Sequence, residues 1–106
     1  MTQVVVKKKN ENINGFHIEG HSGYADRGVD IVCAAISALA VNCVNSIEEF
    51  TSDEFSVGSD EERGMLDFEL TATISEQSEL FLKSLFLGVK EIEKTYGDQY
   101  VRLLNR

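Results

Sequence analysis

The sequence contains no proline and no tryptophan, and it has only two cysteines and two histidines. It also shows no low-complexity stretch, no internal repeat and no change of composition that would mark a linker between domains. We therefore expect the 106 residues, 1–106, to form one domain, which is long enough to bury a core without disulfides or metals. The hydrophobic share of 42% and the charged share of 26% are ordinary for a soluble globular protein.

The scarcity of cysteine excludes several kinds of site. Cys33 and Cys43 fall on one predicted helix about 15 Å apart along its axis, whereas a disulfide needs Cα atoms within about 7 Å. The same separation argues against a zinc ion held by both cysteines with His17 and His21. The absence of a C-x-x-C motif argues against a thiol-redox protein. We therefore expect no metal and no cofactor, and Cys43, deep in the helix, is expected to be an inert buried thiol.

Basic residues are also scarce, with 10 against 18 acidic residues and a formal net charge of −8. The only basic cluster is Lys7–Lys9, so direct nucleic-acid binding is not expected, and a basic peptide or protein is the favoured partner. The first apolar residues precede these lysines, the reverse of a secretory signal. The longest apolar-rich stretch, Ile31–Val44, contains polar residues and falls short of a membrane span. The sequence thus predicts a cytoplasmic protein without membrane contact.

Local patterns predict secondary structure in the order β-β-α-β-β-α-(β). Alternating apolar residues indicate strands at 3–9, 13–19, 54–59 and 65–73, with a short last strand at 101–104. Helical spacing indicates helices at 31–50 and 76–96. This order predicts an α+β domain with a mainly antiparallel sheet of four to five strands and two helices. The first helix is apolar on nearly every side, so we expect it to be covered from more than one direction, including by a second copy of the chain.

The stretch 20–37, GHSGYADRGVDIVCAAIS, carries the residue types of thiol chemistry. Its glycines indicate a loop, and the predicted helix begins directly after Asp30. Cys33 lies in the first helical turn, where unpaired N–H groups and the helix dipole favour a thiolate nucleophile. His21 is the candidate general base. The backbone N–H groups at the helix start, including that of Cys33, are the candidate oxyanion donors.

Two polar residues near the thiol each allow two interpretations. Asp30 either caps the helix or orients the imidazole of His21 as a third catalytic member. Ser37, one helical turn after Cys33, either supports the thiol or bonds back to a helix carbonyl. We expect the preceding loop to contact a peptide and to move as a lid. The loop residues that we expect to bind substrate are Gly20, Ser22, Gly23, Tyr24 and Gly28. Tyr24 either anchors the loop or contacts the ligand.

The stretch 20–37 resembles the signature of the ribosomal-processing cysteine proteases of bacteria, the family called Prp. That pattern is Gly-His-Ala, a short loop, Gly-x-Asp-Ile-Val-Cys-Ala-Ala and a serine soon after; here Ser22 replaces the usual alanine. The chain length and the order of elements also agree with the family. The resemblance implies that Cys33 is the nucleophile, that His21 is the general base, and that Asp30 and Ser37 are possible supporting residues.

The resemblance further implies a homodimeric endopeptidase that removes the apolar, aromatic N-terminal extension of large-subunit ribosomal protein number twenty-seven. The alternative is a non-catalytic module that binds a ribosomal protein or an assembly factor, with Cys33 as a structural thiol. Fast, pH-dependent alkylation of Cys33 favours the enzyme, and an unreactive thiol favours the binding module. A hydrolase of small molecules is a further alternative, although the match of residues 20–37 points to peptides.

Overall fold

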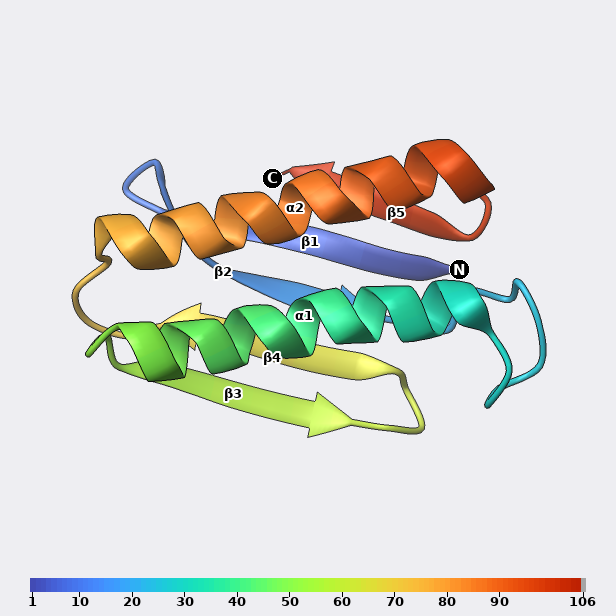
Figure 1. Ribbon diagram of the computed structural model, residues 1–106, viewed down its shortest axis with the longest axis horizontal. Helices are drawn as coiled ribbons and strands as arrows, with labels where there is room; N and C mark the ends of the chain where they lie inside the picture. Colours follow the sequence, from blue (N-terminus) through green and yellow to red (C-terminus); the bar gives the residue numbers. More distant parts are fainter. Residues whose placement is uncertain (106) are drawn as a thin grey trace.

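Two helices run side by side along one face of a five-stranded sheet (Figure 1). The structure is a computed structural model that describes residues 1–105. The predicted α+β class and the order of elements are confirmed, except that the fourth strand ends at Leu70 rather than at residue 73. In chain order the elements are β1 (Thr2–Lys9), β2 (Asn12–Glu19), α1 (Ile31–Phe50), β3 (Phe55–Asp60), β4 (Met65–Leu70), α2 (Glu76–Tyr96) and β5 (Val101–Asn105).

The sheet is mixed rather than purely antiparallel. Its strand order is β3-β4-β2-β1-β5, and β5 pairs in parallel with β1 while the other neighbours are antiparallel. Helix α2 carries the chain back along the whole sheet, so β5 runs in the same direction as β4. Strand β1 has that direction too, because both β1 and β4 are antiparallel to β2. The expected antiparallel sheet is therefore confirmed for four strands, and the fifth adds a parallel edge.

The core lies between the sheet and the helices. Phe16 of β2 and Phe68 of β4 are fully buried and stack with ring centroids 5.5 Å apart. Helix α1 contributes one buried stripe, made of Val32, Ile36, Ala40, Cys43 and Ile47. Other apolar residues of α1 are exposed, including Ile31 at 54% and Val41 at 51%. Within residues 1–105, α1 therefore packs against both the sheet and α2, and its remaining face stays exposed.

Helix α1 is also the one described helix whose length and composition alone would let it cross a membrane. Its most apolar 18-residue window has a mean hydropathy of 1.7. The sequence comparison with a membrane span covered only the apolar run Ile31–Val44, whereas the whole helix Ile31–Phe50 is long and apolar enough to pass this test. Core helices of globular proteins pass the same test, and the buried stripe of α1 belongs to the core between helices and sheet.

The opposite face of the sheet carries a charged network around His17. Its Nδ1 lies 2.8 Å from Oδ1 of Asp67, and its Nε2 lies 2.9 Å from Oε1 of Glu19. Lys7 pairs with Asp67 at 2.7 Å, and Arg63 pairs with Glu19 at 2.9 Å. The hydrogen bond with Glu19, followed by that with Asp67, raises the pKa of His17 above its usual value. His17 thus joins strands β2 and β4 through their outward-facing side chains.

We expect His17 to make the free energy of unfolding pH-dependent near neutrality. A pKa that is higher in the folded state means that protonated His17 stabilises the fold. This contribution is fully present below the unfolded-state pKa of about 6.5 and is lost as the pH rises through the folded-state pKa. Urea unfolding from about pH 6 to about pH 9 should show a steeper loss of stability for the parent protein than for His17→Gln. Parallel pH curves for the two proteins would contradict this role.

Candidate active site

The residues of the 20–37 stretch surround a cavity at one end of the sheet. There β2 leads through the loop into α1, and the β3–β4 turn lies beside them (Figure 1). The cavity has a volume of about 540 Å³ and is lined by His21, Arg27, Gly28, Asp30, Cys33, Ser37 and Glu61. A smaller cavity of about 70 Å³ is also lined by Cys33 and His21. The fold therefore brings the predicted nucleophile and the predicted base to a common space.

The Cys33 sulfur is partly buried in the first turn of α1. The Ser22 N–H donates to Cys33 Sγ at 3.2 Å, so the sulfur lies beside a backbone donor and at the positive end of the helix dipole. The N–H of Cys33 itself donates to Asp30 Oδ1 at 3.0 Å. It is therefore already paired, and this arrangement does not support the expectation that it binds an oxyanion.

Asp30 caps α1. Its Oδ1 accepts hydrogen bonds from the N–H groups of Val32 and Cys33, at 2.9 and 3.0 Å. Among the hydrogen bonds of residues 1–105, none joins the Asp30 carboxylate to His21. Of the two interpretations of Asp30, the geometry therefore favours the helix cap over the orientation of the imidazole.

The second oxygen of Asp30 organises the loop. Oδ2 accepts the hydroxyl of Ser22 and the N–H groups of Tyr24 and Ala25, the latter two at 3.1 and 3.2 Å. Burial opposes ionisation of this carboxyl group, but the hydrogen bonds from Ser22 and the backbone outweigh it and lower the pKa of Asp30 to about 2. One ionised carboxylate thus fixes both the loop and the start of the helix.

The β3–β4 turn, rather than a carboxylate, holds His21. Nε2 of His21 lies 2.9 Å from the main-chain carbonyl oxygen of Glu62. Because a carbonyl only accepts, Nε2 carries the hydrogen and Nδ1 of the neutral ring keeps its lone pair. A free lone pair is what a general base requires. No direct hydrogen bond between His21 and Cys33 occurs in the part of the chain that the structure describes.

The other predicted site residues differ in where they lie. Ser37 and Gly28 line the larger cavity, and Gly20 lines the smaller one. The Ser37 side chain makes no hydrogen bond within residues 1–105, so the bond back to a helix carbonyl, one of its two interpretations, is not observed. Ser22 is buried, at 2% exposure, whereas Gly23 is exposed and lines neither cavity.

Tyr24 anchors the loop to the C-terminal end of α2 and the segment that follows it. Its ring packs edge-on against Tyr96 and Tyr100, with centroids 5.3 and 5.2 Å away. It lines neither of the two cavities around Cys33. Of the two interpretations of Tyr24, the structure therefore favours the anchor.

Sequence reasoning missed the β3–β4 turn as part of the site. Glu61 lines the larger cavity, Glu62 holds His21, and Gly64 lies against both Gly20 and His21. Gly64 has a φ of +60°, and a Cβ atom there would lie 2.5 Å from the Gly20 carbonyl oxygen. A glycine in an otherwise charged turn was the only local signal, because His21 and Glu62 are 41 residues apart.

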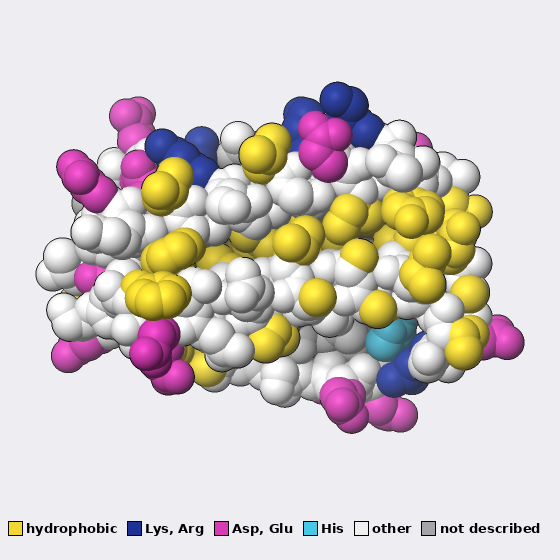
Figure 2. Space-filling model, viewed as in Figure 1, with side chains coloured by type: hydrophobic (Ala, Val, Ile, Leu, Met, Phe, Trp, Pro, Cys, Tyr) yellow, Lys and Arg dark blue, Asp and Glu magenta, His cyan; other side chains and the backbone are white. Residues whose placement is uncertain are grey.

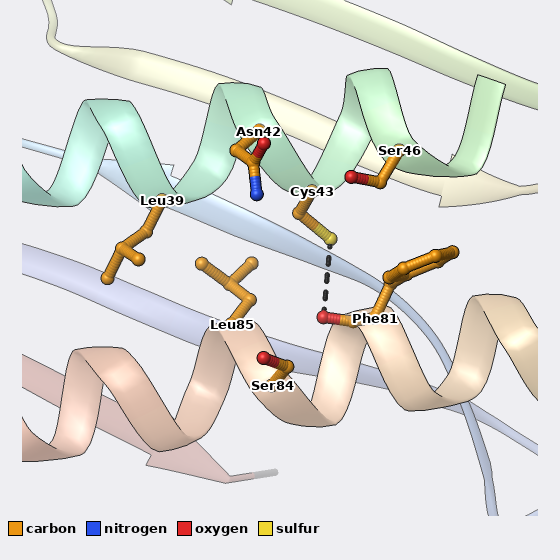
Figure 3. A pocket seen from close by; sticks show the side chains of 7 residues that line it. All are labelled: Leu39, Asn42, Cys43, Ser46, Phe81, Ser84 and Leu85. Carbon is orange, nitrogen blue, oxygen red and sulfur yellow. Dashed lines mark hydrogen bonds between the residues drawn. The ribbon is translucent and has the colours of Figure 1, made fainter. Parts of the chain in front are cut away.

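Cys43 has a different environment from Cys33. It lies between α1 and α2 beside a cavity of about 60 Å³ (Figure 3), and its Sγ is 3.6 Å from the Phe81 carbonyl oxygen. Burial raises the pKa of the Cys43 thiol to about 12, so this thiol stays protonated at neutral pH. This agrees with the expectation of an inert buried thiol.

Comparisons with known proteins point to one family. The family model described as "Cysteine protease Prp" matches residues 1–102. The ribosomal processing cysteine protease Prp of Staphylococcus aureus (strain Mu50) is 28% identical over 81 residues, 76% of each chain. The protein of that name from Bacillus subtilis (strain 168) is 24% identical over 103 residues, 92% of each chain.

Solved structures agree with this assignment. The essential ribosomal processing protease Prp from S. aureus, in complex with a covalently linked product peptide, has a TM-score of 0.91 at 26% identity, with complete coverage of both chains. The S. aureus protease with a substrate peptide has a TM-score of 0.86 at 25% identity, again with complete coverage of both chains. With a family model that spans nearly the whole chain and the matching fold, this chain belongs to the cysteine protease Prp family.

Proposed function

We propose that this chain is a ribosomal-processing endopeptidase that removes the N-terminal extension of large-subunit ribosomal protein number twenty-seven. The observation that carries the proposal is the shared cavity of Cys33 and His21, with the sulfur at a helix start and beside the Ser22 N–H. The relatives named as ribosomal processing proteases support the substrate class, and the resemblance of residues 20–37 supports the particular substrate. A ribosomal-protein substrate makes the cytoplasm the proposed compartment.

In the proposed reaction, Nδ1 of His21 takes the proton of the Cys33 thiol, and the sulfur attacks the scissile carbonyl carbon. The C–N bond then breaks while His21 gives the proton to the leaving amine, which leaves a thioester on Cys33. Water attacks the thioester with His21 as base, and this step releases the carboxylic acid and restores the thiol. Asp30 transfers no proton, because its hydrogen bonds keep it ionised; it holds the loop and the helix start in place.

A further cavity next to the thiol suits an apolar substrate side chain. It has a volume of about 130 Å³, and it shares Ser37 and Glu61 with the larger cavity around Cys33. Its apolar lining consists of Ile18, Ile36, Ala40, Val41, Met65 and Leu66. We assign it to an apolar or aromatic side chain of the extension. The acidic residues Asp60 and Glu61 at its rim suit a basic polypeptide behind the cleavage site.

The first prediction concerns the nucleophile. We expect purified protein to cleave the extended ribosomal protein at neutral pH, and Cys33→Ala to lose at least about 10³-fold in kcat, because covalent catalysis then has no nucleophile. Mass spectrometry of the products measures the loss and locates the cleavage site. Cys43→Ala is the matched control, since it removes the other thiol, and it should retain activity.

Two outcomes would overturn the proposal. If neither the parent protein nor Cys33→Ala cleaves but both bind the ribosomal protein, the chain is a non-catalytic binding module. If both cleave equally, the nucleophile is another residue. Iodoacetamide labelling resolved by mass spectrometry adds a second measurement, in which Cys33 should react faster than Cys43 because the Cys43 thiol stays protonated.

A second prediction tests the apolar cavity. Val41→Glu should raise KM for the extension peptide about tenfold or more, because it places a charge in a site for an apolar side chain. Val57→Glu is the matched control: Val57 is as exposed as Val41, 52% against 51%, but lines none of the three cavities near Cys33. Equal effects of the two substitutions on KM would rule out this assignment.

We also propose that the chain forms a homodimer. Apolar side chains form a continuous band along the seam between α1 and α2 and widen at one end of the molecule (Figure 2). Large exposed apolar residues of the two helices include Ile31, Phe50, Leu80 and Leu87. Such surface is commonly covered by a partner. Sedimentation equilibrium should give twice the 11.8-kDa chain mass, and an 11.8-kDa species at all concentrations would exclude the dimer.

A further inference from the structure

We infer that Arg63 and Glu19 are positioning residues for His21. Their ion pair fixes the β3–β4 turn where the Glu62 carbonyl can accept the hydrogen of His21 Nε2. The inference rests on the proposed function, in which His21 is the general base. In this arrangement a main-chain carbonyl orients the imidazole. The side chains that determine the position of this carbonyl are those that hold the β3–β4 turn against the end of β2.

The contacts between the turn and β2 converge next to His21. The Arg63 guanidinium donates to both carboxylate oxygens of Glu19, with Nη2 2.9 Å from each and Nε 3.1 Å from Oε2. The main-chain oxygen of Arg63 accepts the N–H of Gly20 at 2.9 Å. Glu19 and Gly20 are the two residues before His21, so Arg63 forms hydrogen bonds with both of them.

The turn itself is closed and packs tightly on the site. The Gly64 N–H donates to the Glu61 carbonyl at 3.1 Å, and the Arg63 N–H donates to Asp60 Oδ1 at 3.3 Å. Gly64 lies so close to His21 that a Cβ atom would be 3.0 Å from Cε1 of the imidazole. A turn held this closely cannot shift without changing the distance from the Glu62 oxygen to Nε2.

A substitution of Arg63 tests its positioning role without removing a residue that lines the cavities or belongs to the core. Its side chain is 54% exposed, and it lines none of the cavities beside Cys33. Loss of the ion pair should therefore reduce the fraction of His21 in the Nε2–H tautomer, and with it the fraction with a lone pair on Nδ1. Because small misplacements of a catalytic group act on the chemical step, the effect should appear in kcat and not in KM.

The experiment compares Arg63→Gln, Arg63→Lys and Glu19→Gln with Arg102→Gln, which changes an exposed arginine at the far edge of the sheet. For Arg63→Gln we expect kcat on the extension peptide to fall about tenfold with KM unchanged, less than the roughly 10²-fold that a 1 Å misplacement can cost. Glu19→Gln should match it, and the double variant should be no worse than either. Arg63→Lys should be intermediate, since lysine keeps the charge without the bidentate geometry.

Nitrogen-15 NMR of the imidazoles gives a readout that does not need activity. The chain has two histidines, so a His17→Gln spectrum assigns the His21 signals. We expect the Nε2–H tautomer in the parent protein and in Arg102→Gln, and a mixture of tautomers in Arg63→Gln. An Nδ1–H tautomer in the parent protein, or a reduced kcat with an unchanged tautomer, would overturn the inference. If the parent protein cleaves no peptide, the proposed function fails, and the tautomer comparison still decides the positioning role.

Discussion

The carboxylate of Asp30 is the contact on which the geometry of the site depends. One of its oxygens binds the first free N–H groups of α1, and the other binds the hydroxyl and N–H groups of the loop that precedes the helix. The Ser22 hydroxyl held in this way is next to the Ser22 N–H that donates to the sulfur of Cys33. A single ionised group therefore sets the position of the thiol and of the donor beside it.

A buried negative charge three residues before Cys33, the proposed nucleophile, would by itself oppose a thiolate. The structure resolves this conflict through the donors around Asp30. Four N–H groups and one hydroxyl donate to the carboxylate, and they outweigh its burial strongly enough to lower its pKa to about 2. The charge is thus compensated by dipoles that belong to the loop and the helix start, and no lysine or arginine is needed at this position.

Contacts between residues that are close in sequence could be predicted, and contacts between distant residues could not. The helix start, its cap and the cysteine in its first turn lie within four residues, Asp30–Cys33, so local rules find them. The contact of His21 with Glu62 and the pair of Arg63 with Glu19 span 41 and 44 residues, and they exist only because β2 and β4 are neighbours in the sheet. The last strand was predicted, but its parallel pairing was missed for a related reason, because the pairing of β5 with β1 joins the two ends of the chain.

The two halves of the site differ in how they depend on side chains. At Cys33, the positioning contacts come from particular side chains, those of Asp30 and Ser22. At His21, the contact comes from a backbone carbonyl, and the Glu62 side chain is exposed. What constrains the turn is instead backbone geometry, since Gly64 has a positive φ and no room for a Cβ atom. For His21, the proposed general base, the group that selects the tautomer is therefore a carbonyl oxygen, and no carboxylate is needed for that purpose.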